Sequence, residues 1–585
     1  MDKKALLAFV LCGIIMLYFF NTMQPPQQPV EEGAEEFTEE AVDREGLKER
    51  GLGEDVTAGV EGRKIEKAEK IEKTVQEDIE LQDYILLQND VMKTVWTNEG
   101  AALKSVILPE FRNPERTQVL ELLKPSRTDS LPLSMKLTEE GRYQLKTRRY
   151  KVVESGSDRV VFTTILENGI QITKDISLQS GKYYFDVAIT LQNTTNSEVL
   201  ASYSITAANG LYPEVDKITG LASIAGIDVG KGKTKIAHTD VKDMPYKNES
   251  VGITFAGATN KYFAVVLKPS LNNRIASITS ESVENPDPFY EDDFIVDLHA
   301  KRVSIQPQGE RRHDYVFFLG PKKKEALTQC EGLLAILDYD FGMTRSICKI
   351  LVKILNMFYG VIPNYGVSIL LLTILVKLVL FPLTRKSQMS MVRMQQLQPL
   401  IAQLKEKHKG DKQKVGQEQM KLFKQHGVNP MSGCFPILLQ MPVFFALFRT
   451  LQNSFEMRQA PFVSWVTDLS EPDKLFHLPF TIPFLGEWFN ILPLIMGVAS
   501  FVQMKLTPKT TSGDDPQARM QQKMMQMMPL IFPVILYNFP SGLTLYWTTS
   551  TMISIGEQIL IRRSVKKLDI YYKGKRVIDA KAKVK

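Results

Sequence analysis

The chain has 585 residues, which exceeds the ~100–200 residues of one ordinary domain. It is 44% hydrophobic and 24% charged, with a formal net charge of +6 at pH 7. Its four cysteines are far apart and form no CxxC pair, which argues against a zinc site and a thioredoxin-like redox centre. Charge and hydropathy change sharply along the chain, which indicates several segments of different kinds.

The first segment is short, basic and then apolar. Lys3 and Lys4 precede an apolar run at 5–20, as in a secretory signal peptide. No small-x-small cleavage site follows, so residues 1–23 are predicted to remain as a signal-anchor span with the lysines in the cytoplasm. Residues 24–83 are rich in glutamate and poor in aromatic residues, which predicts a flexible acidic linker.

Residues 84–320 have the pattern of an exported β domain. Short runs of β-branched and aromatic residues alternate with polar ones, for example at 170–178, 303–305 and 315–319. Gly, Asn, Asp and Pro separate these runs, and little helical periodicity lies between them. The pattern predicts a large antiparallel β-sandwich.

This predicted sandwich contains no group of residues typical of catalysis. His238, His299 and His313 stand alone, without metal-ligand spacing, and the acidic residues are expected at solvated strand and turn positions. The glycine-rich stretch 226–234 resembles a phosphate loop only in composition, because neither possible register has the required first glycine. We expect no cofactor, no metal and no enzymatic activity.

Residues 321–363 are predicted to be an amphipathic interfacial region. Apolar side chains recur at helical spacing from Ala326 to Leu337, behind a basic start. The sequence leaves two arrangements open: the stripe lies flat on the outer membrane surface, or it packs on the sandwich. The next apolar run, 347–361, carries two lysines and ends before Pro363, so it is expected to lead into the membrane without crossing it.

Residues 364–561 are predicted to form a core of five membrane spans. The apolar segments lie at 366–383, 435–451, 489–506, 527–539 and 543–561. Together with the signal anchor they make six spans, which places both termini in the cytoplasm. The basic stretch 385–428 and the basic tail 562–585 then both lie inside, as the positive-inside rule requires.

The basic stretch 385–428 is itself predicted to be a cytoplasmic helical hairpin. Apolar residues recur at helical spacing on both sides of a Gly410-Asp411 turn, and Pro399 fits only a kink or a new helix start. Its basic surface is suited to ribosomal RNA or anionic lipid. The alternative is that these charges only fix the topology.

Lys377 lies within the apolar segment 366–383. A lysine at the centre of a span costs ~2.5–3.5 kcal/mol. In one interpretation Lys377 snorkels to the cytoplasmic end of the span, because Arg385 follows only ~12 Å further along the helix axis. In the other it faces a water-filled cavity, with Thr373 one turn back on the same face. Gln440 and Glu557, in other predicted spans, would line this cavity too, or Glu557 would pair with a neighbour.

Several motifs carry a resemblance to a known family. They lie in order at 381–384 (FPLT), 429–436 (NPMSGCFP), 440–442 (QMP), 458–462 (RQAPF) and 539–543 (FPSGL). On these motifs, residues 340–565 resemble the YidC membrane protein insertase family. The order of anchor, sandwich and core resembles the Gram-negative form of this family, which has a large periplasmic domain and lies in the bacterial inner membrane.

The resemblance implies a hydrophilic groove open to the cytoplasm and to lipid. Lys377 occupies the position of the groove's positive residue, which is usually Arg in the family. By position, the residues expected to face the groove or the path of the substrate are Lys377, Thr373, Gln440, Met441, Phe444, Ile531, Ile535, Tyr546 and Trp547. The sandwich would resemble a sugar-mutarotase fold without its chemistry.

The resemblance also implies the function and the partners. The chain would insert and help fold nascent inner-membrane proteins, alone or with the Sec translocon, without ATP hydrolysis. The ribosome would meet the basic hairpin and tail, and anionic lipids would meet the same surfaces. Two rival functions are a small-solute transporter, which predicts inverted repeats, and a periplasmic carbohydrate enzyme, which leaves the five later spans unexplained.

Overall fold

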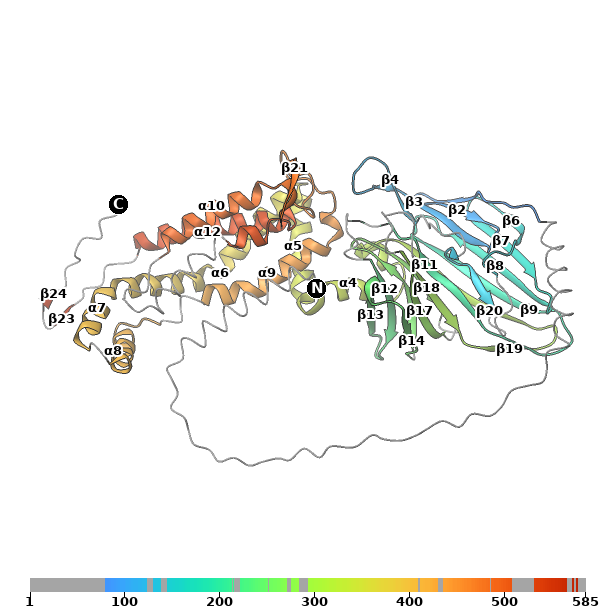
Figure 1. The fold of residues 1–585 in the computed structure, drawn as a ribbon, viewed down its shortest axis with the longest axis horizontal. Helices are drawn as coiled ribbons and strands as arrows, with labels where there is room; N and C mark the ends of the chain where they lie inside the picture. The colour runs from blue at the N-terminus through green and yellow to red at the C-terminus, as the bar shows by residue number, and fades with distance from the viewer. Residues whose placement is uncertain are drawn as a thin grey trace, which may run out of the picture.

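The computed structural model describes residues 79–123, 130–137, 145–212, 214, 221–250, 252–270, 275–283, 293–408, 411–429, 435–483, 485–507, 531–564, 571–572 and 575–576. The predicted signal anchor, most of the acidic linker and most of the basic tail lie outside these residues. A sheet domain (84–321) and a helical part (345–564) lie end to end along the long axis, with helix α4 at their junction (Figure 1).

The largest sheet has nine strands in the order β13-β12-β15-β16-β20-β9-β8-β7-β6, and neighbouring strands run antiparallel. These strands are β6 (Lys151–Ser155), β7 (Arg159–Ile165), β8 (Ile170–Leu178), β9 (Tyr184–Asn193), β12 (Ala222–Asp228), β13 (Thr234–Asp240), β15 (Ile253–Thr259), β16 (Phe263–Pro269) and β20 (Glu310–Pro321). The glycine-rich stretch 226–234 is the β12–β13 hairpin, with left-handed backbone at Gly230, Lys231 and Gly232.

Smaller antiparallel sheets complete the domain. A five-stranded sheet consists of β5 (Met135–Leu137), β11 (Tyr203–Asn209), β14 (Tyr246–Asn248), β17 (Ile275–Val283) and β18 (Asp293–Ala300). A four-stranded sheet consists of β1 (Ile85–Gln88), β2 (Lys93–Thr97), β3 (Ala102–Arg112) and β4 (Val119–Leu123). A further pair joins β10 (Val199–Ala201) to β19 (Val303–Ile305). The prediction that this domain is built of antiparallel strands is confirmed.

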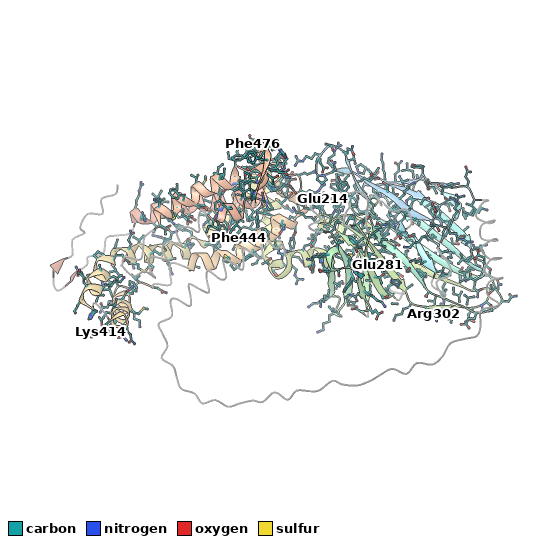
Figure 2. The ribbon with its side chains drawn as sticks, in the orientation of Figure 1. Glu214, Glu281, Arg302, Lys414, Phe444 and Phe476 are labelled. Atoms are coloured by element: carbon teal, nitrogen blue, oxygen red, sulfur yellow. The ribbon has the colours of Figure 1, made fainter. Side chains whose placement is uncertain are left out.

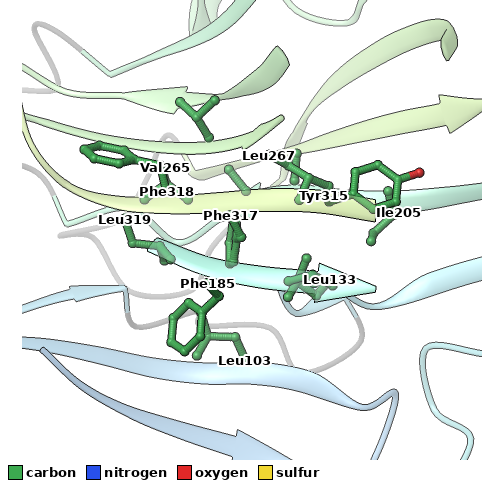
Figure 3. Close-up of a cluster of buried hydrophobic side chains, with 14 of the residues drawn as sticks. Leu103, Leu133, Phe185, Ile205, Val265, Leu267, Tyr315, Phe317, Phe318 and Leu319 are labelled. Carbon is green, nitrogen blue, oxygen red and sulfur yellow. The ribbon is translucent and has the colours of Figure 1, made fainter. Parts of the chain in front are cut away.

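One hydrophobic core holds the sheets together. Leu103 of β3, Phe185 of β9 and Ile205 of β11 are fully buried in the same cluster, although they come from three different sheets (Figure 3). The cause is the period-two pattern of the strands, because alternate side chains of a strand point to the same face. In β8, for example, every second residue from Ile170 to Leu178 is buried.

One inward position of β8 holds a lysine. Lys174 is fully buried, and its Nζ donates hydrogen bonds to the carbonyl oxygens of Gly100, Ala101 and Leu133 at 2.7, 3.1 and 2.7 Å. These carbonyls belong to two loops of the sheet domain. Burial lowers the pKa of Lys174 to about 7. The side chain therefore fastens two loops to the sheet at the cost of burying an ammonium group.

Helices follow the last strand of the sheet domain. They are α3 (Lys324–Leu327), α4 (Leu334–Phe341), α5 (Arg345–Val361), α6 (Tyr365–Gln396), α7 (Gln398–Lys407), α8 (Lys412–Gln425), α9 (Phe435–Asn453), α10 (Leu492–Leu506) and α12 (Ser541–Ser564), with short turns η4 (Gly342–Thr344) and η6 (Phe455–Met457). A further short turn, η2 (Val241–Asp243), lies within the sheet domain between β13 and β14. Residues 531–535 are also helical. Small hairpins are β21 (Phe476–Ile482) with β22 (Gly486–Phe489), and β23 (Tyr571–Tyr572) with β24 (Lys575–Arg576).

The stripe from Ala326 to Leu337 packs on the sheet domain. Ala326, Leu327, Cys330 and Leu333 are buried within the core cluster of the sheets. Of the two arrangements left open by the sequence, the structure therefore shows packing on the domain, and the interfacial expectation does not hold for this part. Helix α5 is different, because it buries one face and exposes apolar residues such as Ile350 and Val361 on the other.

Among the described helices, α6 alone is both long enough and apolar enough to cross a membrane. Its 32 residues span about 48 Å, which exceeds the ~30 Å hydrocarbon core of a bilayer. It continues through Pro382 into the basic stretch, and Pro399 stands in the first turn of α7. Helix α10 is apolar but shorter, and the six-span arrangement stays a prediction.

The basic stretch folds into helices with a small core of their own. Asp411 caps α8 by accepting a hydrogen bond from the Lys414 amide at 3.0 Å. Met394 at the end of α6 and Phe423 of α8 are buried in one small apolar cluster with residues of α7. The C-terminal end of α6 therefore packs with α7 and α8 as one unit, which lies far from the sheet domain in Figure 1.

Candidate functional site

Helix α12 brings the candidate polar residues together. It packs against α6 and α10 and also touches α9. Tyr546, Ser550, Ser554 and Glu557 are four, four and three residues apart, so they lie on one face of the helix. All four are buried. We call these four residues the polar stripe of α12.

Lys377 of α6 is joined to this stripe. Its side chain is buried, and its Nζ donates a hydrogen bond to the Ser554 hydroxyl at 2.7 Å. Glu557, about one turn further along α12, interacts electrostatically with Lys377. Thr373 is also buried, but its hydroxyl donates to the Ile369 carbonyl of its own helix at 2.6 Å. These contacts favour an inward-facing Lys377 over a snorkelling one.

Gln440 of α9 contacts the same stripe at Ser550 and Tyr546. Its Nε2 donates to the Ser550 hydroxyl at 3.0 Å, and the Tyr546 hydroxyl lies at 3.5 Å. Helix α12 thus carries hydroxyl groups that are bonded to α6 through Ser554 and to α9 through Ser550. The polar stripe of α12 therefore contacts both α6 and α9.

The apolar candidates form a second group. Trp547 stacks on Phe532 with ring centroids 4.8 Å apart, and it meets Phe444 edge to face at 5.0 Å. Figure 2 shows Phe444 within the helical part, between the sheet domain that carries Glu214 and the far end that carries Lys414. Ile531 is exposed, whereas Met441 and Ile535 are partly buried. A surface of this kind suits apolar segments of varied shape.

A loop outside this group ties the helices to the sheet domain. We call residues 454–475, between α9 and β21, the joint loop. Its Phe455 is buried in the core of the sheet domain, 5.3 Å from the ring of Phe111 and 5.4 Å from that of Phe263. Its Arg458 donates to both carboxylate oxygens of Glu214 at 2.8 and 3.0 Å. The joint loop is therefore anchored firmly in the sheet domain.

The same loop also binds the ends of the helices. The amides of Ser541 and Gly542, at the start of α12, donate to the joint-loop carbonyls of Glu471 and Leu469 at 2.7 and 2.9 Å. Asn364, which caps α6, donates to the Phe462 carbonyl at 2.9 Å. The ends of α6 and α12 nearest the sheet domain are thus fixed through one loop.

Comparison with known proteins decides the family. The model of the 60Kd inner membrane protein matches residues 357–568, and that of the YidC periplasmic domain matches residues 84–354. A membrane protein insertase YidC from Syntrophobacter fumaroxidans is 32% identical over 488 residues, which cover 79% of this chain and 83% of that protein. One from Pelobacter propionicus is 30% identical over 580 residues, which cover 97% and 100%. The chain belongs to the YidC membrane protein insertase family.

Membership of the YidC family supports an inner-membrane protein with a periplasmic domain and a membrane-spanning helix. The two family models meet between residues 354 and 357, within α5. A galactose mutarotase related enzyme from Lactobacillus acidophilus is 9% identical and covers 42% of this chain and 99% of its own, with a TM-score of 0.30. The mutarotase-like fold stays a prediction.

For this YidC family member, sequence reasoning missed three residues of the site. Ser550 and Ser554 bind Gln440 and Lys377, and Phe532 stacks on Trp547. The available signal was the spacing of four residues from Tyr546 to Ser550 and from Ser550 to Ser554. Serine is common enough in spans that this spacing carries weight only once a partner helix is known. The predicted groove roles themselves stay predictions.

Proposed function

We propose that this chain inserts other proteins into the bacterial inner membrane, and that the polar stripe of α12 with Lys377 admits the hydrophilic tail of a substrate. The observation that supports this most is the buried ammonium of Lys377 on a membrane-spanning helix, bonded to Ser554. A cation in such a place costs ~2.5–3.5 kcal/mol on insertion scales, which points to a functional rather than a structural role.

In this mechanism the tail and the apolar segment of a substrate take different paths. The tail enters the groove, where Lys377 attracts its acidic residues. Once the tail is inside the groove, less hydrocarbon separates it from the periplasm. The apolar segment passes Met441, Phe444 and Trp547 into lipid. Twenty apolar residues at about −0.5 kcal/mol each release ~10 kcal/mol, which is enough to move a short tail without ATP.

The finer features of the proposal follow from the charge distribution. Five core spans and the signal anchor place both termini, the packed basic helices and the basic tail in the cytoplasm. There the basic helices, with lysines such as Lys414 and Lys424, would meet the ribosome or anionic lipid. The periplasmic domain and the joint loop lie on the opposite side. Substrates arrive from the ribosome directly or beside the Sec translocon.

The test uses purified protein in liposomes free of Sec components. Protease protection of a short, acidic-tailed, single-span substrate is followed for wild type, Lys377→Arg and Lys377→Ala. The control is Lys353→Ala, which removes one positive charge on the exposed part of α5. We expect insertion by wild type, Lys377→Arg and Lys353→Ala, and little by Lys377→Ala.

Two other outcomes contradict parts of the proposal. Equal insertion by Lys377→Ala would keep the insertase activity but remove the role of the charge. No insertion by wild type, with a substrate that inserts in native membranes, would overturn autonomous insertion and leave the chain as part of a larger translocon.

A further inference from the structure

Glu557 is an acidic residue buried in the same place as the cation of the proposed site. It lies on the polar stripe of α12, three residues after Ser554, and only 8% of it is exposed. A buried carboxylate is costly unless a cation or several donors compensate for it. Its presence beside Lys377 therefore requires an explanation beyond helix packing.

The two charges act on each other without being bonded. Lys377 and Glu557 are close enough for each charge to stabilise the other. Within the described residues they form no ion pair, and the Lys377 ammonium donates to the Ser554 hydroxyl. An ammonium has three donors and a carboxylate accepts at two oxygens, so both groups keep capacity for a third partner.

The other charges near this end of α12 do not compensate for Glu557. Arg562 and Arg563 follow it on the same helix, five and six residues on, so neither stands at the i+3 or i+4 position of a helical ion pair. Lys377 is thus the counter-charge that the packing of α6 and α12 supplies.

We propose that Glu557 is the resident counter-charge of Lys377, and that the acidic group of a substrate tail takes its place beside the ammonium. This inference rests on the proposed function, since it names the residue that sets which tails that site prefers. With Glu557 present the empty site is nearly neutral. Neutral tails can therefore enter it, and acidic tails bind weakly enough to leave again. Without it the site holds a bare positive charge, which binds acidic tails more tightly and repels basic ones.

The experiment compares one single-span substrate carrying three tails that differ at one position: Asp, Asn or Lys. Insertion rates in liposomes are measured against substrate concentration for wild type, Glu557→Gln and Glu557→Asp. The control is Glu418→Gln, which removes one acidic side chain on the surface of α8, away from the site. Binding of the three tail peptides to the purified full chain is measured in parallel.

For Glu557→Gln we expect the concentration of the Asp-tailed substrate that gives half-maximal insertion to fall roughly tenfold. This is the size of effect expected when one unit charge is removed at close range in a partly buried site. The Asn tail should be unchanged and the Lys tail weakened, and Glu557→Asp and Glu418→Gln should behave as wild type. Equal changes for all three tails, or no change, would overturn the counter-charge role.

The peptide-binding measurement separates this inference from the insertase proposal. If wild type fails to insert any substrate but Glu557→Gln still binds the Asp peptide more tightly than wild type does, the counter-charge stands and the insertase proposal fails. If insertion is normal and peptide binding does not depend on residue 557, the insertase proposal stands and the counter-charge fails. The amount of each variant in the membrane and its thermal unfolding confirm that it is folded.

Discussion

Replacing Glu214 by Gln is expected to loosen the contact between the joint loop and the sheet domain. The side chains of Arg458 and Glu214 are each 4% exposed, and the guanidinium also lies over the rings of Tyr262 and Phe263, 5.9 and 5.3 Å from their centroids. Removing one partner of a buried ion pair costs ~3–5 kcal/mol, because the other charge stays buried without compensation. That cost corresponds to more than about a hundredfold rise in the undocked fraction.

The reciprocal variant, Arg458→Gln, should depend on pH in a way that Glu214→Gln does not. Burial raises the pKa of the Glu214 carboxyl, which Arg458 and Lys261 oppose. A docked state with a raised carboxyl pKa holds more protons than the undocked one, so its stability is greatest at low pH and falls as the pH rises through that pKa. The Arg458→Gln defect should therefore shrink as the pH is lowered toward the ordinary carboxyl pKa of 4.5. Glu214→Gln leaves a guanidinium that cannot lose its proton, so its defect persists.

Hydrogen exchange followed by mass spectrometry on the full chain in detergent measures this docking. The amides of Met457 and Arg458 report it, because they donate to the carbonyls of Ser454 and Phe455 within the segment of the joint loop that contacts the sheet domain. Arg312→Gln is the control, since the Arg312–Asp314 pair is largely exposed and should contribute less than ~1 kcal/mol. If exchange of these amides is as slow in Glu214→Gln as in Arg312→Gln, the buried pair does not hold the two parts together.

Two further predictions concern packing and a buried charge. In Gly366→Ala the new Cβ would lie 2.1 Å from the Phe462 ring, which should cost ~1–3 kcal/mol in thermal unfolding. Gly416→Ala in α8 meets nothing within 4 Å and should be neutral or up to ~1 kcal/mol stabilising, so equal effects would refute the packing argument. Burial lowers the pKa of Lys174 to about 7, so the unfolded state binds more protons between that pH and 10.5. Wild-type stability to denaturant should rise with pH over this window, and the rise should be absent in Lys174→Met.

The strands were predictable because their signal is local. The run predicted at 170–178 is β8 without change, and 303–305 is β19, since period-two alternation is set by the residues themselves. Pro399, which the sequence allowed only at a kink or a new helix start, lies in the first turn of α7. By contrast, the pattern of β8 gave no sign that its inward lysine finds three carbonyl acceptors, because those acceptors lie far away in sequence.

The site was predictable only in part, for a related physical reason. Lys377 is recognisable because a charge inside an apolar segment is costly wherever it points. Ser550 and Ser554 are not, because a serine in a span can satisfy its hydroxyl within its own helix, as Thr373 does. The joint loop was also missed, since Arg458 and Glu214 are 244 residues apart in sequence.

Helix α6 is continuous, so a displacement at one end is transmitted along its length. Its first residue follows Asn364, which is held by the joint loop, and its last turn is packed with α7 and α8. Lys377 lies 12 of the 31 residue steps along this rod, so a tilt about the held end moves it by about two-fifths of the displacement at Gln396. Pro382 lies within this continuous helix, five residues past Lys377, and its missing amide donor makes bending easiest there. Bending there would let the basic helices swing while the ammonium keeps its place beside Ser554.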